Sequence, residues 1–532
     1  MRRWNGWGEE SKQLNLPQEA LTMLLQEVGP SLPQEDLARS ALISKMRPSR
    51  LRRILPCMTR DPGQRLDHAH GQSFPDWVGM RMGSLRRFPD AVAYPESDSE
   101  MQSVMELADK EDLVVIPYGG GTSVVGHLEV PDSPSPVISV SLERMRRMLF
   151  LDGVSRLAGF EAGVRGVEVE AALRPRGFTL GHYPQSFEYS TLGGWVATRS
   201  SGQQSLYFGR IEDLFAGGRV LTPRGLLELS PHPASAAGPD LRELFLGSEG
   251  RMGILTQAVV RVRPAPEVDD IYGVFFRDWD AAVECSRELV ISGLPLSMIR
   301  VSNAQETRTS LLLAGHRGQR RLLEAYLKLR GFGAASHCMA LIGFAGSREV
   351  VSWGRAVACK LIGRLGGLVV GKAVGRAWKR NRFMAPYLRN TLWERGYGVD
   401  TLETAVTWDR VSRTVEAVEA AIREALWPWK EKVLTFSHLS HVYPTGSSIY
   451  TTYLFRLAPS AEETLERWRA MKRVASQAIL RAGGTISHQH GVGLDHKDYM
   501  GAEKGELGLR VLSGILSCVD PAKRLNPGKL VD

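Results

Sequence analysis

The stretch Pro117-Tyr118-Gly119-Gly120-Gly121-Thr122-Ser123-Val124-Val125-Gly126 decides how the rest of the chain is interpreted. It follows a short apolar strand, predicted over 113–116, and a helix, predicted over 97–110, whose apolar residues share one face. Three consecutive glycines permit positive φ and bring successive N–H groups close to a ligand. With the hydroxyls of Thr122 and Ser123, the stretch predicts a concave donor site for a pyrophosphate. It matches neither the Rossmann G-x-G-x-x-G fingerprint nor the Walker G-x-x-x-x-G-K-[ST] loop.

The composition indicates a soluble chain of two or three domains without a disulfide framework. The 532 residues are 43% hydrophobic, and the five cysteines are scattered with no C-x-x-C pair. The first ten residues contain acids and no apolar signal region, and no run of eighteen apolar residues occurs. These features predict a reducing, cytoplasmic location.

The net charge of +9 is concentrated in one window. Residues 350–393 contain no Asp or Glu and nine basic residues: Arg355, Lys360, Arg364, Lys372, Arg376, Lys379, Arg380, Arg382 and Arg389. Such a segment suits a phosphorylated substrate or an anionic membrane surface, at which the protein would be peripheral, or it is simply a solvated face. Nucleic acid is disfavoured because no recognised binding motif accompanies the charge.

The order of patterns divides the chain into four parts. Residues 1–88 form an extension with helical stretches around 18–28 and 34–45. Residues 89–266 contain short strands, glycine turns and the hydroxyl-rich run 181–214, whose composition favours a ligand-facing loop. Strand 137–142 alternates apolar residues with serine and is predicted to be half-buried, and 167–173 is predicted to be helical. Residues 267–487 contain strand–helix–strand units over 271–301, 338–370 and 449–487, and residues 488–532 return to the first domain.

The motifs together resemble the FAD-binding oxidases of the vanillyl-alcohol-oxidase type. PYGGGTS, QSFEYST, TRSS, EGRMGIL, SHQHGVG and LNPGKL occur in that family's order. The resemblance implies an α+β fold, with a two-part FAD-binding domain and an α/β cap domain containing an antiparallel sheet. It assigns FAD to Pro117, Tyr118, Gly119, Gly120, Gly121, Thr122, Ser123, Gln185, Ser186, Phe187, Glu188, Tyr189, Ser190, Thr191, Thr198, Arg199, Ser200, Ser201, Glu249, Gly250, Arg251, Met252, Gly253, Ile254 and Leu255. Thr122 stands where covalent members commonly place a flavin-bearing histidine, so the flavin is expected to be non-covalent.

Within this group the chain is similar to the alkyldihydroxyacetonephosphate synthases (alkylglycerone-phosphate synthases) of ether-lipid synthesis. Supporting segments are Arg3 to Gly8, Glu188 to Arg199 and Thr407 to Arg410. In that family a fatty alcohol replaces the acyl group of acyl-dihydroxyacetone phosphate, and the flavin N5 traps the substrate carbon. The resemblance assigns the substrate phosphate to Arg389 and the catalytic roles to Tyr450, His488, His490 and Arg300, with no metal. It also allows a homodimer.

These roles are chemically sensible, although one position departs from the family pattern. An arginine pairs bidentately with phosphate, and a tyrosine that accepts a proton needs a depressed pKa, which neighbouring cations or the flavin could supply. Gln489 replaces the middle one of three histidines in the family's animal members. On a strand, His488 and His490 would share one face and Gln489 the other.

Three alternatives remain open from the sequence. A 2-hydroxy acid dehydrogenase for glycolate or D-lactate would carry a G-H-x-G-D-G-N-x-H element, but the corresponding residues 437–450 lack its acid and its spacing, with Tyr450 in place of the second histidine. His438 and His441 are spaced closely enough to hold a metal ion. A flavoprotein without catalytic activity, docking on a membrane or a partner, is the third alternative.

Overall fold

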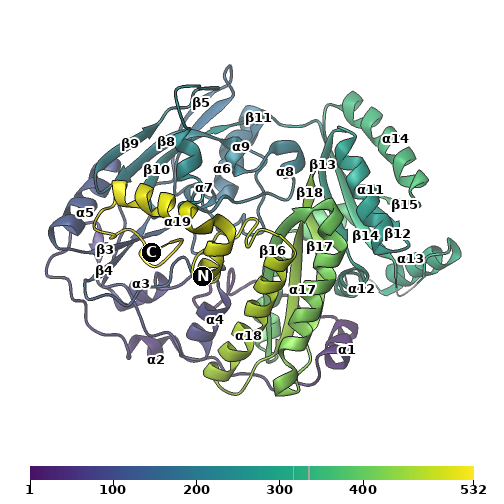
Figure 1. The fold of residues 1–532 in the computed structure, drawn as a ribbon, viewed down its shortest axis with the longest axis horizontal. Helices are drawn as coiled ribbons and strands as arrows, with labels where there is room; N and C mark the ends of the chain where they lie inside the picture. Colours follow the sequence, from purple (N-terminus) through teal and green to yellow (C-terminus); the bar gives the residue numbers. More distant parts are fainter. Residues whose placement is uncertain (315–316, 334–335, 532) are drawn as a thin grey trace.

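The computed structural model describes residues 1–314, 317–333 and 336–531. Figure 1 shows two halves side by side, one built from the earlier part of the chain and one from the residues after about 267, with the C-terminal helix α19 (Met500–Val519) lying across the first half. Among the described residues, no helix combines the length and the apolar character needed to cross a membrane.

The first half contains a four-stranded sheet that presents the glycine stretch. Its strand order is β1 (Met58–Thr59), β2 (Ala91–Ala93), β4 (Val137–Ser141) and β3 (Val114–Tyr118), and the last three strands run parallel. Helix α5 (Asp98–Lys110) is capped by the Ser97 side chain and packs its apolar face on this sheet. Strand β4 is fully buried, not half-buried, because Ser139 and Ser141 also face the interior. Strand β3 ends at Tyr118, so the glycines follow directly at the edge of the sheet.

A five-stranded antiparallel sheet completes this half. Its order is β5 (Met148–Asp152), β6 (Leu157–Glu161), β10 (Ile254–Arg261), β8 (Phe215–Thr222) and β9 (Gly225–Leu229). The predicted helix at 167–173 is present as α6 (Gly166–Leu173). The remaining short elements here are β7 (Phe178–Thr179), α7 (Leu192–Thr198), α8 (Ser205–Phe208), α9 (Ile211–Leu214), α10 (Leu241–Phe245) and β11 (Arg263–Pro264).

The second half is a seven-stranded antiparallel sheet, as the resemblance implied. Its order is β15 (Leu368–Gly371), β12 (Val268–Phe276), β14 (Cys338–Gly346), β13 (Leu296–Ser302), β17 (Leu434–Tyr443), β18 (Gly446–Arg456) and β16 (Tyr397–Thr407). Helices α11 (Trp279–Ile291), α14 (Arg348–Arg364) and α17 (Val411–Ala425) bury their apolar residues against one face of it. Because strand side chains alternate, Ile299 and Val301 join that core while Arg300 points to the opposite face.

The predicted strand–helix–strand pattern holds for two units and fails for the third. Helix α18 (Ala461–Arg481) follows β18, but residues 485–487 form no strand, and Thr485 makes one backbone hydrogen bond to Ala405 of β16 at 3.2 Å. A different helix group covers the Arg300 face: α12 (Ala304–Leu313), α15 (Lys372–Asn381) and α16 (Ala385–Trp393). Helix α13 (Arg317–Leu329) lies at the outer edge of this half (Figure 1).

The N-terminal extension is built into both halves and does not hang from the surface. It contains α1 (Gln18–Glu27), α2 (Arg39–Ile43), α3 (Pro62–Asp67) and α4 (Phe74–Arg81), and α2 is shorter than the predicted 34–45 helix because residues 34–38 are not helical. Trp7, Phe74 and Trp77 are buried with Trp393 of α16 and Trp468 of α18. At the other end of the chain, Leu525 forms a parallel bridge with Val115 of β3.

Candidate functional site

A cavity of about 1010 Å³ lies between the two halves. Three kinds of wall enclose it. The first is formed by the glycine stretch and the loops predicted to hold the cofactor, the second by polar residues of β13, β16, β17 and β18, and the third by apolar residues of α1, α12, α15 and α16.

The glycine stretch is held against residues 189–191, and this close approach explains its composition. A Cβ on Gly120 would lie 1.9 Å from the backbone oxygen of Tyr189, and one on Gly119 would lie 2.4 Å from the Thr191 hydroxyl. Of the three glycines, only Gly121 has a positive φ, at 67°. The stretch thus uses both properties of glycine: Gly121 adopts a positive φ, and Gly119 and Gly120 leave room for the neighbouring side chain and backbone.

Most of the predicted cofactor residues line the cavity. These are Pro117, Tyr118, Gly119, Gly120, Gly121, Thr122, Ser123, Gln185, Ser186, Ser190, Thr191, Thr198, Ser200, Ser201, Glu249, Gly250, Gly253, Ile254 and Leu255. Behind this wall lie Phe187, Glu188, Tyr189, Arg199, Arg251 and Met252. The close-packed glycines and the hydroxyl donors beside them fit a bound FAD, whose phosphates need N–H and O–H donors at close range.

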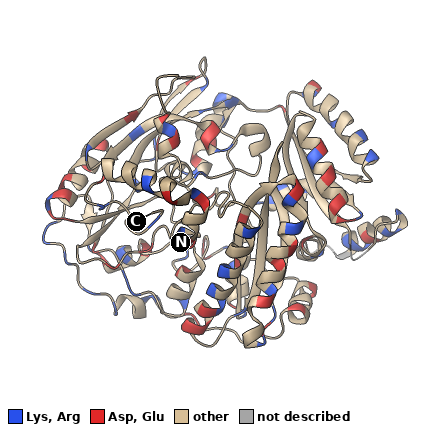
Figure 2. Cartoon of the chain, viewed as in Figure 1, with Lys and Arg blue, Asp and Glu red and all other residues tan. Residues whose placement is uncertain are grey.

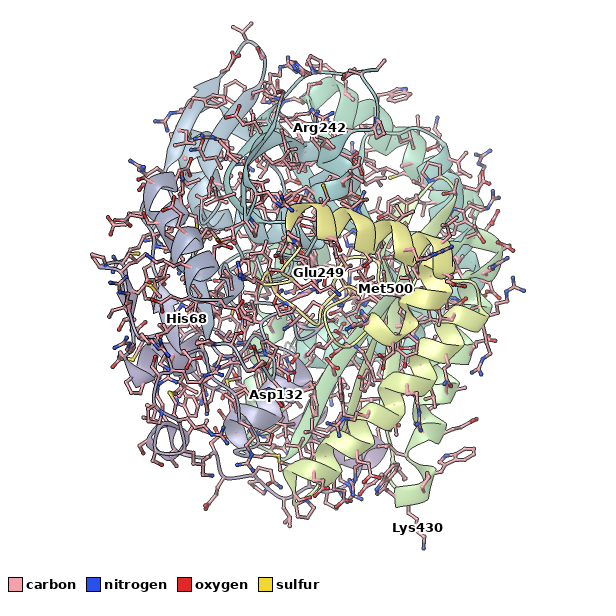
Figure 3. The ribbon with its side chains drawn as sticks, turned by 60° about the vertical axis from the view of Figure 1, so that its left-hand side comes forward. His68, Asp132, Arg242, Glu249, Lys430 and Met500 are labelled. Carbon is pink, nitrogen blue, oxygen red and sulfur yellow. The ribbon has the colours of Figure 1, made fainter. Side chains whose placement is uncertain are left out.

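Glu249 fastens this wall to the C-terminal segment. Its buried carboxylate lies 3.1 Å from Nε2 of His127 and accepts the backbone N–H of Val492 and of Gly493. Nδ1 of His127 in turn lies 2.7 Å from the hydroxyl of Ser123. Burial alone would raise the pKa of Glu249, but His127 and the two amides outweigh burial and lower it. Figure 3 shows Glu249 in the interior, beside the C-terminal part of the chain.

Arg300, His438 and Glu306 form a closed polar group in the second wall. NH1 of Arg300 lies 2.8 Å from Nε2 of His438, and NH2 donates to Glu306 at 2.7 Å. Because arginine only donates, Nε2 of His438 accepts, and Nδ1 donates to Glu306 at 2.9 Å. Burial alone would raise the pKa of Glu306, but His438 and Arg300 bring it to about 2. Glu306 therefore neutralises Arg300.

Tyr450 lies over this group with its hydroxyl protonated. Its ring stacks on His438 with centroids 4.9 Å apart, and its hydroxyl donates to Thr401 at 3.0 Å. Burial raises the pKa of Tyr450 to about 12, and the carboxylates of Glu403 and Asp400 add to the shift. The residues around Tyr450 do not by themselves depress its pKa, because burial and two nearby acids outweigh Arg300 and the bond to Thr401.

Arg389 carries unsatisfied donors at the cavity wall. Its guanidinium stacks on Trp77 at 4.3 Å, and NH1 donates to the backbone oxygen of Gln72 at 2.5 Å. Nε and NH2 are buried and have no hydrogen-bond partner in the part of the chain that the structure describes. Burial lowers the pKa of Arg389. A buried donor without an acceptor is costly, so this guanidinium has hydrogen-bonding capacity that the described residues leave unused.

His488 does not line the cavity, whereas His490 does. Residues 488–490 form a loop, not a strand, so Gln489 and His490 both face the cavity instead of alternating. The ring of His490 meets that of Tyr450 edge-on, with centroids 5.8 Å apart. Burial lowers the pKa of His490. Tyr450, His490, Arg300 and Arg389 are thus brought together at the cavity, with His488 one layer behind.

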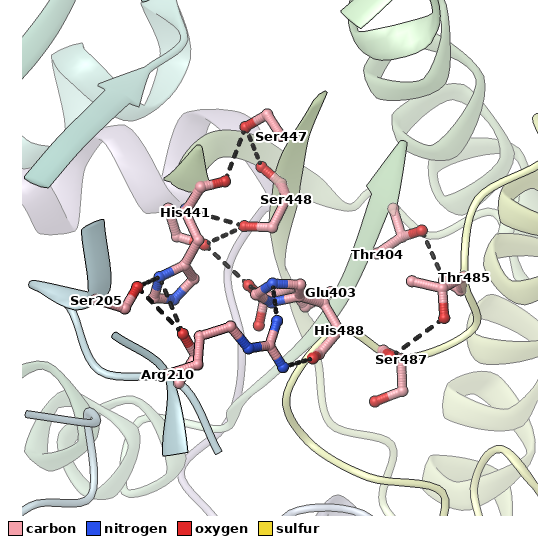
Figure 4. Close-up of polar contacts among 12 residues, drawn as sticks. Ser205, Arg210, Glu403, Thr404, His441, Ser447, Ser448, Thr485, Ser487 and His488 are labelled. Atoms are coloured by element: carbon pink, nitrogen blue, oxygen red, sulfur yellow. Dashed lines mark hydrogen bonds and ion pairs between the residues drawn. The ribbon is translucent and has the colours of Figure 1, made fainter. Parts of the chain in front are cut away.

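His488, His441 and Glu403 form a buried cluster with metal-ligand spacing (Figure 4). Their ligand atoms lie within 4.8 Å of one another. NH1 of Arg210 donates to Nε2 of His488 at 2.8 Å, so Nδ1 donates to Glu403 at 3.0 Å. The Tyr443 hydroxyl lies 2.6 Å from the same Nε2 and also accepts from Arg210. With Nε2 accepting and Nδ1 donating to Glu403, these side chains form a hydrogen-bond relay. The His438 and His441 pairing considered from the sequence is not favoured for a metal, because His438 is engaged by Arg300 and Glu306.

The third wall is an apolar arm of the same cavity. It is contributed by α1 and the residues before it, by α12, α15 and α16, and by the open face of the cap sheet: Leu14, Leu16, Ala20, Met23, Leu24, Leu311, Leu313, Val374, Ala377, Trp378, Leu388, Leu392, Val399, Leu434, Phe436 and Leu454. Helix α15, on this wall, belongs to the basic segment. One cavity thus joins a phosphate-binding loop, a buried arginine and a long apolar surface.

The basic segment divides into three groups in the structure. Lys372 pairs with Asp270 at 2.6 Å and Lys379 with Asp269 at 2.5 Å, so part of its charge is neutralised. Arg380, Arg382 and Arg389 line the cavity. The exposed remainder includes Arg355, Lys360 and Arg364 of α14. Figure 2 shows that acidic and basic residues are interspersed along most other elements.

Several site residues were not predicted from the sequence. Three charged residues on separate elements are examples: Glu306 pairs with Arg300, and Arg210 and Glu403 both contact His488. Each reaches its partner only through sheet order and loop packing. Trp7 also lines the cavity, although the sequence placed it in an appendage. The only available signal was the alternation along β13 and β17, which places Arg300 and His438 on the same face of neighbouring strands.

Comparison with known proteins gives a consistent picture. Residues 89–230 match the FAD binding domain model, and residues 265–530 match the model of FAD linked oxidases, C-terminal domain. The chain is 30% identical to an alkyldihydroxyacetonephosphate synthase of Dictyostelium discoideum, over 99% of this chain and 93% of that protein. A solved structure of an alkyldihydroxyacetonephosphate synthase superposes with a TM-score of 0.85 at 27% identity, covering 99% of both chains. A mitochondrial D-lactate dehydrogenase (cytochrome) of Arabidopsis thaliana is 25% identical, over 83% of this chain and 73% of that protein.

Proposed function

Because this chain belongs to the FAD-linked oxidases, and within them to the alkyldihydroxyacetonephosphate synthase family, we propose that it is an FAD-dependent transferase of ether-lipid synthesis. It exchanges the acyl group of an acyl-dihydroxyacetone phosphate for a long-chain alcohol. The bound flavin supplies the covalent chemistry at the substrate carbon. The residues of the chain bind the phosphate, seat the alkyl chain and control the protons.

The observation that carries this proposal is the continuity of the cavity. The cofactor loops, Arg389 and the apolar arm open onto the same space of about 1010 Å³. A substrate that is both phosphorylated and long-chained needs a buried cation and an apolar channel that meet beside the flavin. A small 2-hydroxy acid would leave most of the apolar wall of this cavity without contact.

Arg389 is assigned to the phosphate. Its buried Nε and NH2 lack acceptors, and phosphate oxygens would supply them in a charge-assisted fork. The stack on Trp77 and the bond to Gln72 fix the plane of the guanidinium, so little side-chain entropy is lost on binding. Arg300 is less free for this role because Glu306 already neutralises it.

Tyr450 and His490 are assigned to proton control at the substrate ketone. Since the pKa of Tyr450 is about 12, its hydroxyl is a donor at neutral pH and is suited to polarise or protonate a carbonyl oxygen. The lowered pKa of His490 keeps that imidazole neutral and able to accept a proton. His488 acts through the relay behind the cavity, where Glu403 and Arg210 fix its tautomer.

Product analysis tests the proposal. Purified holoenzyme is incubated with acyl-dihydroxyacetone phosphate and a radiolabelled fatty alcohol, and in parallel with D-lactate or glycolate and an electron-accepting dye. We expect labelled ether product and released fatty acid, with no dye reduction. Dye reduction without ether product would replace the transferase by the dehydrogenase. Neither product would favour a flavoprotein without catalysis.

We also propose that the basic segment contacts an anionic membrane through α14. Trp353 is 60% exposed, and Val350 and Val357 lie on the same helical face with Lys360 and Arg364 beyond them. An apolar stripe followed by bases is suited to lying at a lipid interface. Co-sedimentation with vesicles containing phosphatidylserine should exceed that with phosphatidylcholine alone, and Trp353→Ala with Lys360→Glu should abolish the difference. Equal binding to both kinds of vesicle would contradict the proposed membrane contact. The homodimer expected from the sequence stays a prediction.

A further inference from the structure

The N-terminal hairpin, residues 2–9, contacts both halves of the site. Arg2 and Glu9 form an antiparallel bridge, and the N–H of Arg3 donates to the carbonyl of Gly8 at 2.7 Å. Asn5, Gly6, Trp7 and Gly8 are buried. Contacts with two separate parts of the site hold this segment in place.

On the cofactor side, the hairpin fixes the back of the glycine stretch. NH2 of Arg2 donates to the carbonyl of Gly120 at 2.6 Å, and the same guanidinium lies 5.3 Å from the ring centre of Tyr189. Arg2 does not line the cavity, whereas Gly120 does. A carbonyl held outward by Arg2 restricts the rotation of the peptide planes beside it. Arg2 therefore bears on which way the donors of this loop point.

On the substrate side, the hairpin is hydrogen-bonded to α16, the helix that carries Arg389. The side chain of Asn390 accepts the N–H of Trp7 at 3.1 Å and donates to the carbonyl of Trp7 at 2.9 Å. The ring of Tyr387 packs so closely on Gly8 that a Cβ there would lie 2.2 Å from it. Gly8 also has a φ of 78°, which favours glycine. A second path runs through Gln72, which donates to the carbonyl of Gly6 at 3.2 Å and accepts from Arg389.

We propose that the N-terminal hairpin is a positioning element of the active site, which orients the glycine stretch for the cofactor through Arg2 and holds α16, and with it Arg389, through Trp7. The effect on the cofactor does not depend on the transferase chemistry, whereas the effect on Arg389 rests on the proposed function. Neither Arg2 nor Asn390 lines the cavity, so each acts through the residues that do.

The rate of flavin release from the holoenzyme tests whether Arg2 orients the glycine stretch for the cofactor. Arg2→Ala removes one hydrogen bond made by a charged donor, and we expect flavin to dissociate about tenfold faster after dilution, followed by the rise in free-flavin fluorescence. Arg2 is exposed, so the variant should keep the wild-type circular dichroism. The matched control is Arg53→Ala, an exposed arginine of the same extension for which the described residues provide no hydrogen bond or ion pair. Wild-type release from Arg2→Ala, or equally fast release from Arg53→Ala, would overturn the proposal.

Asn390→Ala tests whether the hairpin connects α16 to the glycine stretch. Asn390 touches Trp7 and not the cavity, so a role confined to holding α16 would leave flavin release unchanged. We expect faster flavin release together with a raised KM for the phosphorylated ketone. A raised KM with wild-type flavin release would reject the connection while leaving the proposed function intact. If the wild-type protein made no ether product but released flavin normally, only the proposed function would be rejected.

Discussion

Replacing Arg389 by lysine tests the assignment of the substrate phosphate most directly. Lysine keeps the positive charge, but it offers a point charge in place of the planar fork and cannot reproduce the stack on Trp77 at 4.3 Å. Both Nε and NH2 of Arg389 lack acceptors among the described residues, so the variant loses at least one charge-assisted bond in the complex with substrate. Such a bond contributes about 1.5–3 kcal/mol to substrate binding, whereas the cation–π contact with Trp77 is present with or without substrate and adds nothing to this difference. We therefore expect a loss of about 2 kcal/mol, or about 30-fold.

The assay measures the KM and kcat for acyl-dihydroxyacetone phosphate in the purified holoenzyme. If Arg389 binds the phosphate equally in the ground state and the transition state, KM rises about 30-fold while kcat changes little. Flavin content should stay at the wild-type value, since the glycine stretch is untouched. Arg376→Lys is the matched control, because Arg376 is exposed on α15 and makes no hydrogen bond or ion pair with the described residues. An unchanged KM in Arg389→Lys, with full flavin content, would refute the reasoning.

Four further outcomes are expected. Tyr450→Phe keeps the ring stacked on His438 but removes the hydroxyl, so turnover should fall about 10²–10⁴-fold with FAD retained, and a loss of less than threefold would contradict the role. Gly120→Val should yield apoprotein, because a Cβ there meets the Tyr189 carbonyl at 1.9 Å, and a yellow purified variant would contradict the close approach. Acid precipitation should leave all yellow colour in the supernatant, since Thr122 cannot bear a histidyl–flavin bond, and a coloured pellet would show covalent FAD. The free energy of unfolding should fall as pH drops from about 6.5 towards 4: burial lowers the pKa of His182 and His441 to about 3 and that of His68 to about 4, so the unfolded chain binds protons that the folded protein does not. A flat stability profile over that range, measured by denaturant titration, would contradict this pH dependence.

Local chemistry determined the cofactor half of the site. The order strand, glycine stretch, hydroxyl-rich run and Glu249 segment already predicts a phosphate-binding loop, because close backbone approach requires glycine and phosphate requires short-range donors. The helix over 97–110, the strand before the glycines and the first two strand–helix–strand units follow equally from periodicity. These features depend on neighbours within a few residues, so the linear sequence contains them.

Long-range packing determined the rest of the site. Arg300 and His438 meet because β13 and β17 are neighbours in the sheet, and His488 meets Glu403 and Arg210 across three distant segments. The protonated state of Tyr450 depends on burial and on Asp400 and Glu403, which no local pattern specifies. The N-terminal residues differ most from the expectation, because they form part of the cavity wall and not an extension at the surface. Their partners are far away in the sequence: Trp7 bonds to Asn390, 383 residues later, and Arg2 to Gly120, 118 residues later. Sequence by itself thus determined which chemical groups are present, whereas only the tertiary structure decided which of them share low-dielectric surroundings and therefore which charges and protons they hold.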